Sequence, residues 1–426
     1  MGKANSVIKG EIMFSEKLLS IARDAERELK PIFDKLEEIS FENTKRVLET
    51  YREHRVSEAM LGTTTGYGYD GVGRDALDRI YADVFGAESA FVRHSIANGT
   101  SALTIGLFGL LRPGDVLLSV TNRPYDTLCE VIGIEGANGD GSLADFGVEY
   151  DQVDFKGDKI DFDGIEEKLN KHGDRVKVVF IQRSKGYLNR PTLTIDEIGK
   201  ICDFVHARSK AWVVVDNCYG EFCEDREPCH VGADLIIGSL IKNPGGGIAQ
   251  SGGYIAGKKR AVELASYRLT SPGTGTEVGA TLNQNRNMFK GFFLAPHIVM
   301  QAKKTAHFAA YVFEKLGFDV YPRYNEMRSD IIQTVKFGYA NGLIKFCQGV
   351  QSASPVDSYV TPMPWAMPGY QDEVIMAAGT FTQGSSIELS ADGPVRPPYT
   401  AFFQGSLTYE SGKIAILTSA EKLIEE

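Results

Sequence analysis

The sequence predicts an α/β protein with a large, mainly parallel sheet between helices, followed by a smaller α+β part. Short apolar runs without polar alternation, such as "VKVVFIQ", "AWVVVDN" and "ADLIIGS", are typical of strands buried on both faces. Helical patterns separate these runs, and such alternation of strand and helix favours a parallel sheet. Beyond residue 316 we expect further strands with helices between them, in "DIIQTVKF", "VIMAAGTF" and "SSIELSA".

Helices are predicted where apolar residues recur every three or four positions. The first covers residues 15–58, and Pro31 is expected to kink or divide it. Another begins at Thr194, which has Glu197 in capping-box spacing, and a long helix is expected over residues 295–316. The predicted division of the chain is an N-terminal helical arm, a large α/β domain and a small C-terminal α+β domain, at residues 1–65, 66–315 and 316–426.

Charge and composition exclude several classes of function. The net charge of −10, with both signs interspersed, argues against a nucleic-acid partner, because nucleic acid needs a basic face. No apolar run is long enough to span a bilayer, so we expect a cytoplasmic protein without a membrane partner. Four possible metal ligands lie close together, but their spacing matches no paired metal motif, which favours reduced thiols and no metal site: Cys218, Cys223, Cys229 and His230.

Three polar features follow predicted strands, where ligands bind in an open α/β sheet. Asp216 closes "AWVVVD", and an aspartate there is costly to bury without a cationic partner. Lys242 follows "ADLIIGSLI" and either extends to water or stays inside as a nucleophilic amine. The turn "ANGTSAL" leads from strand to helix, and its free N–H groups suit a phosphate.

Together these features match the needs of pyridoxal 5'-phosphate (PLP). This cofactor needs a lysine for its aldehyde, a carboxylate beside its pyridine nitrogen and donors for its phosphate. Lys242 and Asp216 provide the first two groups, and Ser239 adds a hydroxyl near the phosphate turn. PLP is therefore the predicted cofactor.

From about residue 60 onward the chain resembles fold-type I PLP-dependent enzymes of the cysteine and methionine metabolism group. "VVVDN" followed by "GADLIIGSLIKNPGGG" is similar to the Asp-to-Lys segment of that group, and "GYGYDGVGRDALDRIYADVFGAESAFV" to its block before the phosphate turn. "IQRSKGY" and "VVVDNCYGEFCE" resemble the aluminium-resistance, methionine γ-lyase-like branch, which includes proteins similar to cystathionine β-lyase. The resemblance implies the PLP transferase fold of type I.

The resemblance also implies roles for individual residues. Lys242 would hold the cofactor and move the Cα proton of the substrate, while Asp216 would pair with the pyridine nitrogen. Gly99 and Thr100 would give backbone N–H groups to the phosphate, and Ser239 its hydroxyl.

Two tyrosines match aromatic positions of the group. Tyr125 would stack on the cofactor, and Tyr67 would reach the phosphate of a neighbouring subunit, which implies a homodimer or homotetramer with shared active sites. The group usually has an arginine two residues beyond the second tyrosine, whereas this chain has Tyr69 there and its next arginine is Arg74.

Two arginines are candidates for contacts with the small-molecule substrate. Arg396 is the first choice for the substrate carboxylate, because it lies in the C-terminal part where the group places this residue. Arg183, in "IQRSKGY", follows a strand and is a candidate for contact with the cofactor or the substrate. Either arginine is alternatively part of a structural ion pair.

The predicted function is that of a carbon–sulfur lyase acting on a sulfur amino acid of the cystathionine, methionine or cysteine type, by β- or γ-elimination. One alternative is another fold-type I enzyme, an aminotransferase or an aldolase. A second alternative, from a different class, is a PLP-binding protein with a role in metal tolerance.

Overall fold

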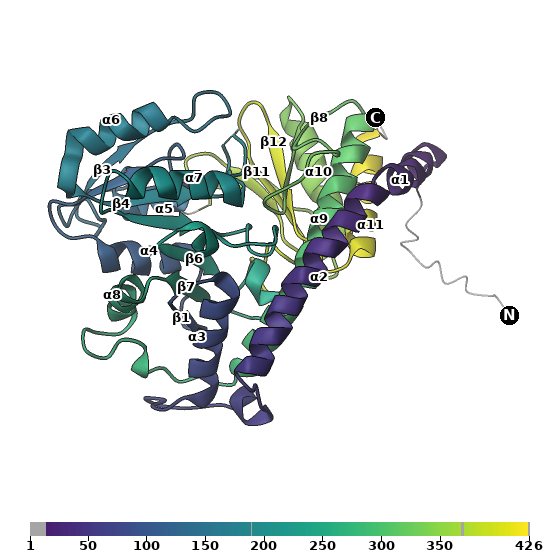
Figure 1. Cartoon of the computed structure of the whole chain (residues 1–426). Helices are drawn as coiled ribbons and strands as arrows, with labels where there is room; N and C mark the ends of the chain where they lie inside the picture. The colour runs from purple at the N-terminus through teal and green to yellow at the C-terminus, as the bar shows by residue number, and fades with distance from the viewer. Residues whose placement is uncertain (1–13, 189, 368–369, 425–426) are drawn as a thin grey trace.

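The computed structural model describes residues 14–188, 190–367 and 370–424. Its larger sheet has seven strands in the order β1-β7-β6-β5-β4-β2-β3 (Figure 1). Strands β2 to β6 pair in parallel, while β7 is antiparallel to both of its neighbours. The bounds are β1 (Ser89–Arg93), β2 (Val116–Ser119), β3 (Glu149–Gln152), β4 (Val176–Gln182), β5 (Trp212–Asp216), β6 (Leu235–Ser239) and β7 (Gly253–Gly257).

Helices cover both faces of this sheet, which explains its continuous apolar strands. In β5, Val213 and Val215 pack in one core and Val214 packs in the core on the opposite face. The helices on the first side are α3 (Val72–Phe85), α6 (Phe162–His172) and α7 (Ile195–His206), with the predicted capping box at Thr194. Those on the other side are α4 (Gly99–Leu110), α5 (Asp126–Ile132) and α8 (Lys259–Leu269).

The C-terminal part forms a second sheet of five strands, in the order β10-β11-β12-β9-β8, and all of its pairings are antiparallel. The elements are β8 (Asp319–Tyr321), β9 (Ile332–Lys336), α10 (Ala340–Ser352), β10 (Val374–Ala377), β11 (Ser390–Pro394), β12 (Thr400–Gln404) and α11 (Tyr409–Ile424). The predicted fold class is confirmed, whereas the proposed domain boundaries stay a prediction.

The N-terminal arm is divided as its proline predicts. Helix α1 (Glu16–Glu28) ends at Leu29, and α2 (Lys30–Glu53) begins with Pro31 in its first turn, where a missing N–H costs no hydrogen bond. In Figure 1 the two helices run diagonally along α9, from the neighbourhood of α11 toward α3. Asn43 anchors α2 to the loop after β5 by donating to the carbonyl of Glu224 at 2.9 Å.

One long helix, α9 (Asn285–Lys315), passes from the first core to the second. It begins ten residues before the predicted start. In the second turn of α9, Gly291 packs against the short 3₁₀ helix η4 (Asn243–Gly245), which follows Lys242. A Cβ at Gly291 would lie 2.2 Å from the carbonyl oxygen of Gly245, so only glycine fits this contact.

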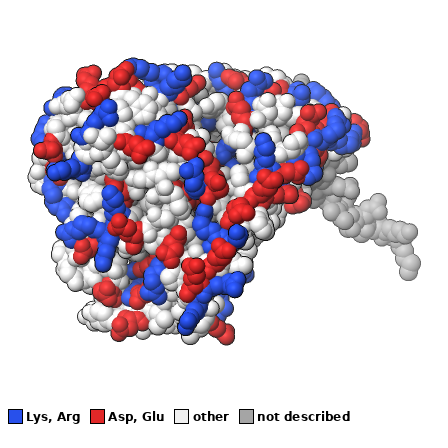
Figure 2. All heavy atoms as spheres, in the orientation of Figure 1, with Lys and Arg blue, Asp and Glu red and all other residues white. Residues whose placement is uncertain are grey.

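Acidic and basic side chains are interspersed over the face shown in Figure 2, as their distribution along the sequence predicts. No helix in the described part of the chain is both long and apolar enough to cross a membrane.

Replacing Gly291 by alanine tests the contact between α9 and η4. We expect the Gly291→Ala protein to lose about 1–3 kcal/mol of unfolding free energy, because the added methyl meets rigid backbone. Denaturant unfolding measures this loss. Lys290→Ala is the matched control, since Lys290 is the exposed neighbour on the same helix and its truncation should change little. Equal stability of the two variants would contradict the close contact.

Candidate active site

The carboxyl ends of β4, β5 and β6 bring polar residues to one edge of the large sheet. Parallel register places Gln182 beside Asp216, and Asp216 beside Ile237 of β6. Ser239 ends β6, and Lys242 follows three residues later. The strand ends that the sequence singled out are therefore neighbours in space.

A cavity of about 410 Å³ opens at this edge. Six of the nine predicted site residues line it, namely Gly99, Thr100, Tyr125, Asp216, Ser239 and Lys242. The C-terminal sheet and the loop before β10 close the other side of the cavity, with Tyr370, Asp392, Phe402 and Gln404. The cavity therefore lies between the two sheets.

Lys242 and Asp216 form the charged centre of the cavity. The Lys242 Nζ lies 4.1 Å from the centroid of the Tyr219 ring. Burial lowers the pKa of Lys242, but Cys218, Tyr219 and Asp216 together raise it above its ordinary value. Burial raises the pKa of Asp216, while the charge of Lys242 and the N–H of Cys218, which donates to Asp216 at 3.1 Å, lower it.

The N-terminus of α4 provides free donors next to this centre. Asn98 caps the helix by accepting from the N–H of Ser101 at 2.8 Å, which leaves the earlier N–H groups of Gly99 and Thr100 without an intrahelical acceptor. The buried hydroxyl of Ser239 has no hydrogen-bond partner among the described residues. This combination of donors suits an anion.

Gly99 keeps space open between these donors and the lysine. A Cβ at Gly99 would lie 3.3 Å from the sulfur of Cys218 and 3.8 Å from the Nζ of Lys242. Thr100 extends the polar wall, because its hydroxyl lies 2.8 Å from that of Thr127.

Tyr125 joins the two sheets across the cavity. Its N–H donates to the side chain of Gln182 at 2.7 Å, and its hydroxyl is hydrogen bonded to that of Tyr370. Burial raises the pKa of Tyr125 well above its ordinary value, so the hydroxyl is neutral. The proposed stacking of Tyr125 on a cofactor stays a prediction.

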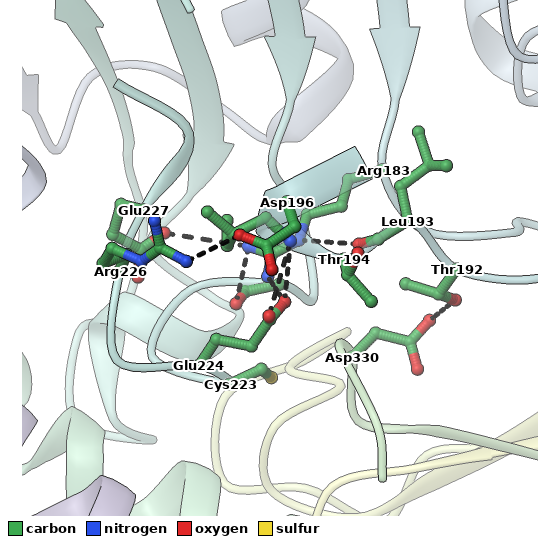
Figure 3. Close-up of polar contacts among 12 residues, drawn as sticks. Arg183, Thr192, Leu193, Thr194, Asp196, Cys223, Glu224, Arg226, Glu227 and Asp330 are labelled. Carbon is green, nitrogen blue, oxygen red and sulfur yellow. Dashed lines mark hydrogen bonds and ion pairs between the residues drawn. The ribbon is translucent and has the colours of Figure 1, made fainter. Parts of the chain in front are cut away.

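Arg183 is not brought into the cavity. Its fully buried guanidinium contacts Glu224 at 2.9 Å and Glu227 at 3.8 Å, and donates to the side chain of Asn217 at 2.9 Å (Figure 3). These contacts favour the structural ion pair that was the alternative for this residue. Arg183 joins the end of β4 to the loop after β5.

Arg396 also lies outside the main cavity. It pairs with Asp372 at 2.6 Å and lines a smaller cavity of about 140 Å³, which shares the walls Tyr187 and Phe402 with the main one. The prediction that Arg396 binds the substrate carboxylate has no support from this placement.

Tyr67 is 74% exposed and stacks on Tyr69, with ring centroids 5.5 Å apart. It does not line the cavity of its own chain. Its predicted contact is with a neighbouring subunit, so this contact stays a prediction.

Sequence reasoning missed several residues of the cavity. Gln182 ends β4 as Asp216 ends β5, so the rule applied to Asp216 would have found it. Tyr370, Asp392 and Gln404 come from the C-terminal part, where no strand-end rule applies because the sheet is antiparallel. Only the tertiary structure brings them to Lys242.

The four possible metal ligands are not gathered. Cys218, Cys223 and Cys229 are free thiols, and His230 accepts from the N–H of Glu227 at 3.0 Å. Within residues 14–188, 190–367 and 370–424, no group of three or more His, Cys, Asp or Glu side chains could hold a metal ion.

The fold defines the class of protein. YhfS from Escherichia coli, a pyridoxal-5'-phosphate dependent protein, shares the architecture at a TM-score of 0.61 and 15% identity, over 92% of this chain and 97% of that one. The fold is therefore that of the type I PLP transferases.

The chain belongs to the methionine gamma-lyase family, whose model matches residues 18–424. YnbB, an uncharacterized protein of Bacillus subtilis, is 52% identical over 96% of this chain and 97% of that protein. A carbon-sulfur lyase involved in aluminum resistance from Clostridium novyi NT is 48% identical, with a TM-score of 0.93 over 96% of this chain and 97% of that structure. The resemblance noted in the sequence is confirmed.

Two arginines in Figure 3, Arg183 and Arg226, allow a buried ion pair to be compared with an exposed one. We expect Arg183→Met to cost about 3–5 kcal/mol of unfolding free energy, because it removes the cation beside the buried carboxylate of Glu227 and breaks the pair with the partly buried Glu224. Arg226→Met breaks a pair with Asp196 in which the side chains are 46% and 72% exposed. This control should cost about 0–1 kcal/mol. Denaturant unfolding of both variants measures the difference, and similar losses would refute a structural role for Arg183.

Proposed function

We propose that this protein is a PLP-dependent carbon–sulfur lyase. It removes the sulfur-bearing substituent of a sulfur amino acid by β- or γ-elimination and yields an α-keto acid and ammonia. The proposal is carried by one observation: a single cavity holds an amine, a buried carboxylate and an anion cradle, from Lys242, Asp216 and the N-terminus of α4.

The residues present fit the three ends of PLP. Lys242 would hold its aldehyde carbon and Asp216 its pyridine nitrogen. Gly99, Thr100 and Ser239 offer two free N–H groups and an unpartnered hydroxyl for the phosphate. The cavity volume of about 410 Å³ lies within the usual range of roughly 300–1,000 Å³ for small-molecule sites.

PLP, when bound, supplies a sink for the electrons left at the substrate Cα. The chain must supply a base for the Cα proton, and Lys242 is the amine of the cavity. A neutral amine is required for this step. Asp216 helps to raise the pKa of Lys242. If Asp216 paired with a pyridinium, that effect would be weaker, and the amine would more readily be neutral and able to accept a proton.

Relatives support the choice of reaction. The family is named for methionine gamma-lyase, and the Clostridium novyi relative, which is 48% identical, is named a carbon-sulfur lyase. We also propose a homodimer or homotetramer in which Tyr67 of one subunit completes the phosphate site of another. The high exposure of Tyr67 leaves it available for such a contact.

Loss of Lys242 tests the proposed function. We expect purified protein with PLP to absorb in the visible range and to release keto acid from a panel of sulfur amino acids. Lys242→Ala should remove both properties, with activity lower by about a thousandfold or more, as for other essential catalytic groups. Borohydride reduction and peptide mapping should locate the cofactor on Lys242.

Lys200→Ala is the control for this experiment, because Lys200 is exposed on α7, outside the cavity lining. An adduct on another lysine, or no keto acid from any sulfur amino acid, would refute the proposal.

A methyl group in the anion cradle tests the phosphate site. Gly99→Ala should leave the cofactor-free fold intact, because alanine suits a helix better than glycine by about 1 kcal/mol. We expect PLP to bind at least about tenfold more weakly, equivalent to about 1.4 kcal/mol, since the methyl points toward Cys218 and Lys242. Titration of PLP by absorbance measures the affinity. Ser101→Ala, in the same helical turn, should bind PLP normally.

A further inference from the structure

One buried carboxylate of the cavity has no role in the proposed function. Asp392 lies on β11, is 8% exposed and lines the cavity that holds Lys242. Its Oδ2 accepts from the Nε2 of Gln404 at 3.2 Å, while its buried Oδ1 has no hydrogen-bond partner in the described part of the chain. The Asp392 carboxylate is therefore held in place by one oxygen, while its other oxygen lacks a hydrogen-bond donor.

The charges around the cavity show what Asp392 lacks. Among its described lining residues, Lys242 is the only lysine or arginine, and Asp216 is the only other acid. The proposed function uses both of these groups for PLP. Further cations, Lys185, Lys336 and Arg396, line the smaller cavity behind Tyr187 and Phe402.

A buried carboxylate without a close counter-charge is costly. Burial raises the pKa of Asp392 to about 6, while the neighbouring side chains of Tyr187 and Gln404 and the charge of Lys242 lower it. A neutral side chain of similar size would avoid this cost. The cost is recovered when a cation enters the cavity and pairs with the carboxylate. Such a cation must come with a ligand, because the chain provides none there beyond Lys242.

We infer that Asp392 binds a second ammonium group of the substrate, carried on the part of the molecule beyond sulfur. The α-amino group is used in the reaction at Lys242, so the group that Asp392 binds is a different one. This inference rests on the proposed function and narrows its substrate class. It favours thioethers whose departing portion bears a cation over methionine, whose departing portion is a neutral methyl thiol.

Two compounds of equal size test this inference. S-(2-aminoethyl)-L-cysteine and S-propyl-L-cysteine differ only in an ammonium in place of a methyl group, and the corresponding homocysteine thioethers cover γ-elimination. We expect the wild-type protein with PLP to favour the aminoethyl compound at least about tenfold in kcat/KM, because a desolvated charge pair favours the charged ligand. Asp392→Asn should reduce this preference to about twofold or less, and kcat/KM should fall more for the aminoethyl compound than for the propyl compound.

A binding measurement separates recognition from turnover. Calorimetry with the Lys242→Ala protein and PLP should show tighter binding of the aminoethyl compound, and the Lys242→Ala, Asp392→Asn double variant should lose that difference. Asp319→Asn is the control for charge removal on the second sheet, because the Asp319 side chain is 74% exposed. It should keep the preference.

The possible outcomes distinguish two failures. Keto acid release without a preference for the aminoethyl compound, or an equal loss of both activities in Asp392→Asn, would overturn the role of Asp392 and keep the lyase. Binding preference without keto acid from any of the four compounds, or from the wider panel of sulfur amino acids, would overturn the lyase and keep Asp392 as an ammonium site. Thermal unfolding of Asp392→Asn checks that the variant is folded.

Discussion

Parallel pairing of β4, β5 and β6 is the constraint on which the site depends. Parallel strands in register end at the same edge of the sheet, so Gln182, Asp216 and Ser239 lie near one another there. Their proximity follows from strand pairing and does not require contacts between their side chains. The strands are buried on both faces, and polar groups are therefore confined to their ends. Lys242 lies at the same edge because it follows the end of β6 by three residues, immediately before η4.

The second sheet completes the site, and α9 connects the two. This helix belongs to both cores, so it fixes the C-terminal sheet against the edge where Lys242 lies. Across the cavity, the paired hydroxyls of Tyr125, at the start of α5, and Tyr370, in the loop before β10, link the two parts of the chain. The cavity thereby has one wall from the strand ends of the large sheet and another wall, with Asp392, from the C-terminal sheet.

Prediction from sequence succeeded where local rules decide structure. The valines of β5, the capping box at Thr194 and the break near Pro31 each depend on a few neighbouring residues. Prediction from sequence was weaker where segments that are distant along the chain meet in the fold. Arg183 lies at the end of a strand, as Asp216 does, but its guanidinium forms ion pairs with Glu224 and Glu227 from a later loop. No local sequence pattern predicts those partners.

The sequence by itself determined the fold class, the family and the groups at strand ends, because apolar runs and strand-end residues are properties of short segments. Only the tertiary structure decided which side chains share the cavity. It placed Arg396 behind Tyr187 and Phe402, and it brought Asp392 to the cavity of Lys242. The physical reason is that antiparallel strands end at both edges of a sheet, so the position of a residue along such a strand does not reveal which cavity it faces.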